Sequence, residues 1–144
     1  MNKETINSKV MIIGGGVTGL AAALSLDSLG IESVIVEKHS VLGGKVKEYS
    51  KVFPDFRSGK AISRELIENV EQSSRIKTIV SATVGKVERI NGAYSVTTTD
   101  KKQYKVKAII LAAGFDVFDA RFQEEYGYGV YPNVVNSLEL EALL

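Results

Sequence analysis

The sequence predicts an α/β fold in which a central parallel sheet is joined to a small antiparallel β-meander. Three observations predict it. An apolar run, Val10–Ile13, is followed at once by a glycine turn and a helical pattern. A second apolar run, Ser33–Glu37, comes after that helix, and a later segment, 83–106, alternates polar and apolar residues. Strands separated by helices favour parallel pairing, whereas closely spaced strands with turn signals favour antiparallel pairing.

The glycine turn fits the pattern G-x-G-x-x-G at Gly14, Gly16 and Gly19. The first glycine of this pattern allows a tight turn, the second lets backbone approach a pyrophosphate, and the third lets helix and strand pack closely. The free amides at the start of the helix favour an anion. A merely flexible glycine loop is the alternative interpretation. The candidate contacts from this turn are Gly14, Gly15, Gly16, Val17, Thr18 and Gly19.

Glu37 ends the second apolar run and lies 18 residues beyond Gly19. This spacing is close to the ~20 residues expected for the acid that binds a ribose hydroxyl in dinucleotide-binding domains. A carboxylate there accepts hydrogen bonds from an adenosine 2′-OH and repels a 2′-phosphate. The alternative is an exposed acid at the end of a strand. Together, the turn and Glu37 predict a Rossmann-like domain that binds an adenine dinucleotide.

Length and composition favour one globular domain. The chain has 144 residues, of which 44% are hydrophobic and 24% charged, and its net charge is +1. Such a charge gives no case for binding nucleic acid or an anionic membrane. The chain has no cysteine and a single histidine, His39, which excludes thiolate-ligated iron–sulfur clusters and histidine-based metal clusters within these residues. With no signal peptide or membrane-spanning run visible in the sequence, we expect a cytoplasmic location.

The remaining elements follow from the spacing of apolar residues. A polar lead-in, residues 1–8, is expected to be loosely held. Apolar residues at helical spacing predict helices, and short apolar runs between polar segments predict buried strands. The expected helices are Val17–Leu29, with Gly30 as its stop, and Ala61–Val70, and the further strands of the parallel sheet are Ile76–Val80 and Ala108–Leu111.

Segment 83–106 has the pattern of an antiparallel meander. Asn91-Gly92 separates two β-type runs, and Asn-Gly is a strong hairpin signal because a type I′ turn needs two residues with positive φ. Tyr94, Val96 and Thr98 then alternate with polar residues at the period of a strand. A third strand, around Tyr104, completes the expected meander.

A second glycine pair, Gly43-Gly44, follows Glu37 after a short loop. Backbone without a Cβ would let a bulky cofactor lie across the chain at this point. The alternative is a turn that needs positive φ. Lys38 and Lys45 flank this loop and are candidates for neutralising phosphate charge, against the alternative of solvated lysines. His39 in the same loop is expected to be exposed, with contact to the ligand as the alternative.

These residues carry a resemblance to a known family. The glycine turn, Val36-Glu37-Lys38 and Leu42-Gly43-Gly44-Lys45 resemble flavoproteins with two dinucleotide-binding motifs. More narrowly, the chain looks like the FAD-binding region of heterodisulfide reductase A-like flavoproteins, and the resemblance runs through nearly the whole chain. The further segments that carry it are Phe53-Pro54, Ala113-Gly114-Phe115-Asp116, Tyr126-Gly127-Tyr128-Gly129 and Pro132-Asn133-Val134.

The resemblance implies FAD as the cofactor and assigns roles to several positions. It implies that Glu37 holds the ribose, and that Gly43 and Gly44 pass beneath the pyrophosphate and the flavin side. It also implies main-chain contact of Val84 with the adenine, and places Ala113 and Gly114 at the ligand crevice, where tight packing alone is the alternative. Members of that group normally have cysteines after their Phe-Pro, whereas this chain has none, so their iron–sulfur role is not carried over.

The C-terminal segment, 115–144, predicts an irregular aromatic loop and a short final helix. Its aromatic residues are interpreted either as a surface that flanks the flavin or docks a partner, or as apolar packing onto the domain. Asn136 and Glu139 form a candidate capping box for a helix over Ser137–Leu144. If the leucines of that helix are exposed, they offer a patch for a missing domain or for a second copy in a homo-oligomer.

The leading function hypothesis is an FAD-binding electron-transfer domain that passes electrons to a redox partner protein or to missing domains, an iron–sulfur centre among the candidates. One alternative is the NAD-binding domain of a dehydrogenase, against which the second glycine pair and the meander argue. Another is a non-catalytic module that senses nucleotide or bridges subunits. The sequence singles out no catalytic acid–base residue and no set of metal ligands.

Overall fold

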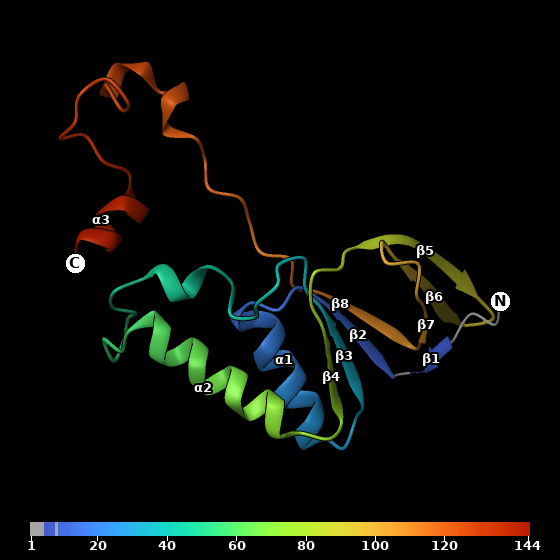
Figure 1. Ribbon diagram of the computed structural model, residues 1–144. Coiled ribbons are helices and arrows are strands. Elements are labelled where there is room, and N and C mark those ends of the chain that lie inside the picture. Colours follow the sequence, from blue (N-terminus) through green and yellow to red (C-terminus); the bar gives the residue numbers. More distant parts are fainter. Residues whose placement is uncertain (1–4, 8) are drawn as a thin grey trace.

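The computed structural model describes residues 5–7 and 9–144 and shows three layers (Figure 1). Two helices cover one face of a parallel sheet, and an antiparallel meander covers the other. Two apolar clusters fill the spaces between these layers. One lies on the helix side, around Ile12, Leu20 and Ile35, and the other lies on the meander side, around Met11, Val34 and Tyr104.

The parallel sheet has the strand order β4-β3-β2-β8. Its central strands are buried at every position but Ile13, because their side chains are covered on both faces, which explains their continuous apolar sequences. This confirms the expected strands, two of which end one residue earlier than predicted. The strands are β2 (Val10–Ile13), β3 (Ser33–Val36), β4 (Ile76–Ile79) and β8 (Ala108–Leu111).

The two long helices match the predicted ones to within two residues at each end. Helix α1 (Val17–Ser28) is followed by Gly30 with φ +70°, as the sequence predicts. Helix α2 (Gly59–Gln72) begins two residues earlier than predicted, because the Ser58 side chain caps it by accepting a hydrogen bond from the Ala61 amide at 3.1 Å. Both helices contribute apolar side chains to the cluster on the helix side of the sheet, as their apolar spacing predicts.

The meander consists of β5 (Val84–Ile90), β6 (Ala93–Thr98) and β7 (Gln103–Val106). Asn91 and Gly92 both have positive φ, which confirms the hairpin. The polar lead-in is different from what we expected: β1 (Thr5–Asn7) pairs in parallel with β7 and extends this sheet. Residues 1–4 and 8 of the lead-in lie outside the described residues.

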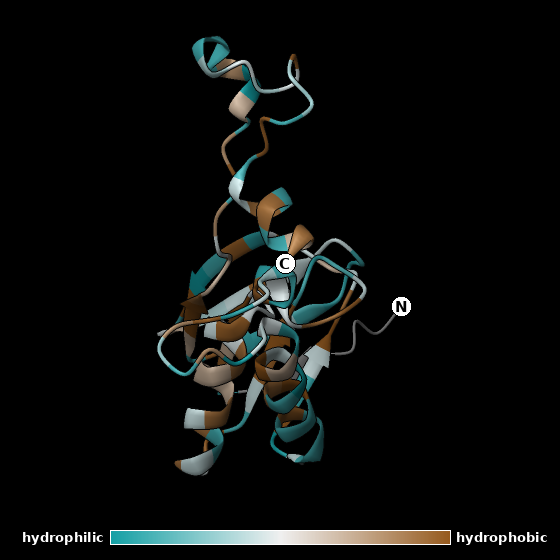
Figure 2. Ribbon diagram, turned by 90° about the vertical axis from the view of Figure 1, so that its left-hand side faces the viewer, coloured by the Kyte–Doolittle hydropathy of each residue, from teal (hydrophilic) through white to brown (hydrophobic). Residues whose placement is uncertain are grey.

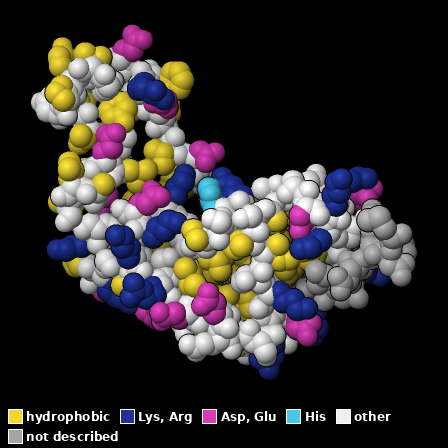
Figure 3. All heavy atoms as spheres, viewed as in Figure 1, with side chains coloured by type: hydrophobic (Ala, Val, Ile, Leu, Met, Phe, Trp, Pro, Cys, Tyr) yellow, Lys and Arg dark blue, Asp and Glu magenta, His cyan; other side chains and the backbone are white. Residues whose placement is uncertain are grey.

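Residues 115–144, which we call the arm, project away from the three layers (Figures 1 and 2). The arm holds two short 3-10 helices, η2 (Ala120–Phe122) and η3 (Glu124–Tyr126), and helix α3 (Ser137–Leu143). Five of its aromatic side chains are 60–78% exposed, which contradicts the interpretation that they pack onto the domain, although the Phe115 ring lies 4.9 Å from Lys45 Nζ. Space-filling spheres show apolar side chains along the arm (Figure 3), and the most exposed aromatic ones are Phe115, Phe118, Phe122, Tyr126 and Tyr131.

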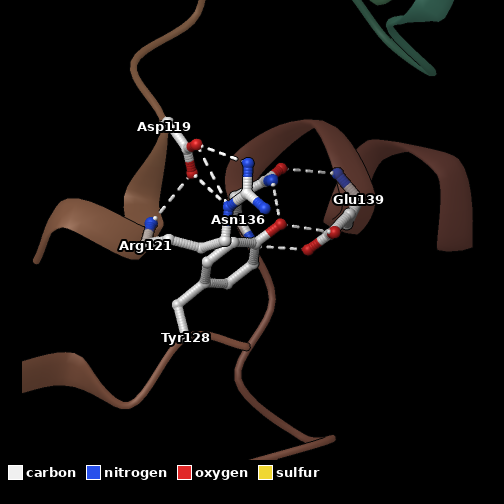
Figure 4. Close-up of polar contacts among 5 residues, drawn as sticks. All are labelled: Asp119, Arg121, Tyr128, Asn136 and Glu139. Atoms are coloured by element: carbon white, nitrogen blue, oxygen red, sulfur yellow. Dashed lines mark hydrogen bonds and ion pairs between the residues drawn. The ribbon is translucent and has the colours of Figure 1, made fainter. Parts of the chain in front are cut away.

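The arm is organised by its own polar contacts (Figure 4). The capping box predicted at Asn136 and Glu139 is present at the start of α3. The Tyr128 hydroxyl donates to Glu139 Oε1 at 2.7 Å and accepts from Asn136 Nδ2 at 2.9 Å. Asp119 pairs with Arg121, with the closest nitrogen and oxygen 2.6 Å apart. A link to the remainder of the chain runs from the Ser50 amide to Glu141 Oε2, at 2.8 Å.

Candidate dinucleotide site

A cavity of about 450 Å³ lies at the carboxyl ends of β2, β3 and β8. This is the edge of an open α/β sheet where ligands bind, and the volume lies within the range of small-molecule sites. The cavity is lined by residues of five segments. These are the glycine turn with the start of α1, the end of β3 with the residues that follow it, residues 44–49, the approach to β5, and the chain that leaves β8.

The three glycines of the G-x-G-x-x-G pattern differ in what a side chain at each position would contact. Gly14 has φ +110°, and a Cβ there would lie 2.2 Å from the Ala112 carbonyl oxygen. A Cβ on Gly19 would lie 1.9 Å from the Gly14 carbonyl oxygen. A Cβ on Gly16, by contrast, would meet only the Gly44 Cα at 3.8 Å. Gly16 is therefore the glycine that leaves open space in the cavity, while Gly14 and Gly19 allow close packing.

The start of α1 offers an anion its backbone amides. Gly16 occupies the N-cap position and no side chain caps the helix. The first amides of a helix have no partner within it, and the helix dipole adds positive potential there. Val17 and Thr18 line the cavity at this point. The arrangement suits a phosphate or diphosphate group.

Glu37 is buried, with 6% of its surface exposed, and lines the cavity. Its Oε2 accepts a hydrogen bond from the Gly15 amide at 2.6 Å, and its Oε1 accepts one from the His39 amide at 2.8 Å. These bonds fix the carboxylate and leave further lone pairs on each oxygen. A ligand hydroxyl in the cavity can therefore still donate to Glu37.

The second glycine pair packs against the first turn. The Gly43 amide donates to the Gly15 carbonyl at 2.8 Å, and a Cβ on Gly44 would lie 2.9 Å from the Gly16 Cα. Gly43 and Gly44 have φ of +110° and +61°, so the turn interpretation describes their backbone. Gly44 also lines the cavity. The two glycine segments thus form one continuous wall.

Lys45 joins this wall to the chain that leaves β8. Its Nζ donates to the Phe115 carbonyl oxygen, lies 4.9 Å from the centre of the Phe115 ring and is 3.9 Å from Asp116 Oδ1. All three residues line the cavity. Lys38 and His39, both exposed, line it as well. The cavity therefore carries cationic groups near the uncapped start of α1, which suits a ligand with phosphates.

The structure brings most of the predicted site residues to this one cavity. Gly15, Gly19 and Gly43 are the exceptions: they are buried behind it and support its wall. The predicted residues that line the cavity are Gly14, Gly16, Val17, Thr18, Glu37, Lys38, Gly44, Lys45, Val84, Ala113 and Gly114.

Sequence reasoning missed several lining residues. Ala82, Thr83 and Ala112 are sequence neighbours of predicted residues, so a wider window around each motif would have included them. Tyr49 reaches the cavity only through the fold, and no local signal marks it, whereas Asp116 lies two residues after the predicted Gly114. His39 lines the cavity too, which agrees with the alternative considered for it. The missed residues are Ile13, Val36, Val46, Tyr49, Ala82, Thr83, Ala112, Phe115 and Asp116.

Comparison with known proteins also identifies relatives of this chain among oxidoreductases. Residues 4–140 match the family model described as pyridine nucleotide-disulphide oxidoreductase. The chain is 25% identical to a CoB–CoM heterodisulfide reductase iron-sulfur subunit of Methanocaldococcus jannaschii, over 96% of this chain and 33% of the relative. The corresponding iron-sulfur subunit of Methanopyrus kandleri is also 25% identical, over 99% and 34%. The chain thus spans about a third of the length of these relatives.

Solved structures share the fold. L-proline dehydrogenase from P. horikoshii superposes with a TM-score of 0.70 at 24% identity, over 77% of this chain and 23% of that one. Thioredoxin reductase from T. acidophilum gives 0.68 at 21% identity, over 78% and 37%. Among the helices that the structure describes, none is long and apolar enough to cross a membrane. The chain belongs to the pyridine nucleotide-disulphide oxidoreductase family, whose membership implies FAD as its cofactor.

Proposed function

We propose that this chain is the FAD-binding part of an electron-transfer oxidoreductase related to the iron-sulfur subunit of heterodisulfide reductase. One observation carries the proposal: the glycine turn, Glu37 and the second glycine pair, separated in sequence, meet at a single cavity. A flexible glycine loop or an exposed acid would not require such convergence. The family match over residues 4–140 supports the same function.

The residues present fit the ADP half of FAD. Gly16 leaves space that a Cβ would occupy, and the uncapped start of α1 would hold the pyrophosphate there. Glu37 would accept hydrogen bonds from the ribose, since its carboxylate faces the cavity and is already fixed. Lys45 would offset phosphate charge, and Val84 would contact the adenine.

When bound, FAD supplies two-electron chemistry, and the protein supplies binding and orientation. Three features of this chain would contribute to binding and orienting the cofactor. Packing of Gly43 and Gly44 on the first turn keeps the cavity wall rigid, Glu37 fixes the turn, and Lys45 places a positive charge at the mouth. No residue of this chain is proposed as an acid or base.

A redox partner follows from the chemistry of the chain and from its relatives. The names of those relatives describe subunits, and that of the Methanocaldococcus jannaschii protein describes an iron-sulfur subunit. This chain contains no cysteine, so the ligands of such a cluster would come from another domain or protein. The arm, with its exposed aromatic side chains, is the candidate surface for that contact and for a homo-oligomer through the C-terminal segment. The single-domain organisation and the cytoplasmic location remain predictions.

Two experiments test the function. The purified chain is reconstituted with FAD and its absorbance spectrum recorded after removal of unbound cofactor, with NAD as the comparison ligand. We expect flavin bands and no comparable retention of NAD, whereas retention of NAD alone would favour the dehydrogenase alternative. Anaerobic reduction by dithionite, followed by an acceptor protein, then tests electron transfer. Bound flavin that no acceptor reoxidises would favour a non-catalytic nucleotide-binding module.

A further inference from the structure

The chain that enters β5 reaches the cavity at Thr83 and Val84, and both residues line it. One residue earlier, the Ala82 amide donates to the Glu37 carbonyl at 3.0 Å, which ties this segment to the end of β3. Thr83 has a second partner in Thr99, which follows the last residue of β6. Thr99 is not among the residues that line the cavity. Any effect of Thr99 on a ligand must therefore act through Thr83 and its neighbours.

Thr99 occupies both backbone groups of Thr83. The Thr99 amide donates to the Thr83 carbonyl at 2.9 Å, and the Thr83 amide donates to Thr99 Oγ1 at 3.1 Å. The Thr83 hydroxyl donates to the same oxygen at 3.4 Å. In a regular antiparallel pair, two opposite residues exchange two backbone hydrogen bonds. The Thr99 hydroxyl oxygen therefore takes the place of the Thr99 carbonyl oxygen in this pair.

The Thr83–Thr99 pair determines where the backbone of Val84 points. Val84 is opposite Thr98, and hydrogen-bonded and non-hydrogen-bonded pairs alternate along an antiparallel ladder. Because Thr83 and Thr99 are the bonded pair, the amide and the carbonyl of Val84 face away from β6. The Thr98 amide follows the same alternation, since it donates to the Lys102 carbonyl at 3.1 Å and not to β5. The Val84 backbone is thus directed out of the meander, at a residue that lines the cavity.

The turn that carries Thr99 is held by its own side chains. Thr98 is buried, and its hydroxyl donates to Asp100 Oδ1 and to the Lys102 carbonyl. Lys102 Nζ lies 3.0 Å from Asp100 Oδ2. These contacts keep the turn in one conformation, so the Thr99 hydroxyl is already placed for the Thr83 amide.

We propose that Thr99 is a positioning residue for adenine recognition, which acts through Thr83 to hold the Val84 amide and carbonyl toward the base. The inference rests on the function proposed above, in which Val84 contacts the adenine of FAD. A neighbouring amide and carbonyl suit adenine, whose N6 amino group donates beside ring nitrogens that accept. Hypoxanthine has a carbonyl oxygen in place of this amino group and a proton on N1, so it presents the opposite pattern. Thr99 therefore supports selectivity for the base as well as affinity.

Titrations of the purified chain with ADP and with inosine 5′-diphosphate, which carries hypoxanthine, test this role. We expect the wild type to bind ADP more tightly than inosine diphosphate. Thr99→Val keeps the branched shape but loses the hydroxyl, and it should bind ADP about three- to tenfold more weakly, the range of one net hydrogen bond. Its affinity for inosine diphosphate should change little. Because Thr83 is exposed, water can replace the lost acceptor, so the urea midpoint should stay that of the wild type.

Three further variants separate positioning from packing. Thr99→Ser retains the hydroxyl and should keep the wild-type affinity for ADP. Thr99→Ala lacks the hydroxyl and should repeat the loss seen with Thr99→Val. Thr97→Val makes the same exchange two residues earlier, on β6 and outside the lining of the cavity, and should bind both nucleotides as the wild type does.

An unchanged ADP affinity in Thr99→Val would overturn the inference. Equal losses for ADP and inosine diphosphate would overturn it too, because a merely structural effect does not distinguish the two bases. In both cases the wild type would still bind ADP, and the proposed function would stand. A wild type that binds neither FAD nor ADP would contradict the proposed function, and the inference with it.

Discussion

The Glu37 carboxylate holds the amide of Gly15, 22 positions earlier in the chain, with its Oε2 2.6 Å from the backbone nitrogen. The same carboxylate binds the His39 amide through its other oxygen. Glu37 therefore joins the end of β3 to the glycine turn through contacts within the protein. This contact makes the predicted ribose-binding acid a support of the turn as well, and it links cofactor affinity to stability.

Glu37→Gln is expected to weaken both the binding of the cofactor and the stability of the fold. The glutamine side chain has one carbonyl oxygen, so its NH₂ group would face one of the two backbone amides that Glu37 now satisfies. Loss of a charge-assisted hydrogen bond to a buried amide costs about 1–3 kcal/mol. We expect a fall of this size in the free energy of unfolding by urea, together with weaker binding in an FAD titration. Glu32→Gln, at an exposed position near the start of β3, is the control, and equal urea midpoints for the two variants would contradict this role.

Gly19→Ala and Gly16→Ala are expected to differ strongly, although both lie in the same motif. A Cβ at position 19 would lie 1.9 Å from the Gly14 carbonyl oxygen, whereas one at position 16 meets no atom closer than 3.8 Å. Overpacking against fixed backbone costs about 1–3 kcal/mol and occasionally more. Thermal unfolding should therefore show a large loss for Gly19→Ala and little change for Gly16→Ala. Similar unfolding temperatures would show that α1 and the turn are not packed as described.

Tyr104→Phe is expected to stabilise the chain. Tyr104 is fully buried between the two sheets, and its hydroxyl has no hydrogen-bond partner among the described residues. Burial also raises the pKa of this phenol. Removing an unsatisfied buried hydroxyl gains about 1 kcal/mol, which urea unfolding can measure. Tyr94→Phe, on the neighbouring strand β6 and only partly buried, is the comparison, and a loss of stability in Tyr104→Phe would mean that the hydroxyl is satisfied.

The start of α3 is expected to loosen in acid. Hydrogen bonds from the Asn136 amide and the Tyr128 hydroxyl lower the pKa of Glu139, and the bond to Glu139 raises the pKa of Tyr128. Because the folded pKa of Glu139 lies below the unfolded value of ~4.3, this stabilisation is complete above that value and is lost as pH falls through the folded pKa. The protection of the α3 amides against hydrogen exchange, relative to their intrinsic exchange rates at each pH, should fall over this range. Glu139→Gln should remove the pH dependence and Glu124→Gln should keep it; identical profiles for the two would count against the network.

Much of the fold follows from local sequence signals. Val10–Ile13 has the continuous apolar pattern of a central parallel strand, and Asn91-Gly92 specifies a hairpin through its backbone. The β1 strand shows the limit of such signals. Thr5–Asn7 is too short to show a periodic pattern, and its pairing with β7 is a contact between distant parts of the chain.

The candidate site also contains some residues that a local sequence signal identifies and others that only the fold brings to the cavity. Gly16 and Glu37 belong to a motif whose spacing reflects cofactor geometry, so the sequence identifies both. The contact of Lys45 with Phe115 joins residues 70 positions apart, and Tyr49 reaches the cavity from the end of a short 3-10 helix, η1 (Gly44–Glu48). Neither has a local pattern, because both depend on how the second glycine pair packs on the first turn.

Binding of FAD to the purified chain, measured by calorimetric titration, tests the central claim most directly. Wild type is expected to bind FAD at one site, with ADP as a competitor, because we propose that this cavity holds the adenine dinucleotide. Gly16→Val should lose this binding while it keeps its circular dichroism spectrum, since its side chain would occupy the open space beside Gly44. Gly85→Val, on β5 with only an ordinary contact at 3.5 Å, should bind as wild type does. FAD binding that Gly16→Val leaves unchanged, or no binding by the wild type, would contradict the assignment of this cavity.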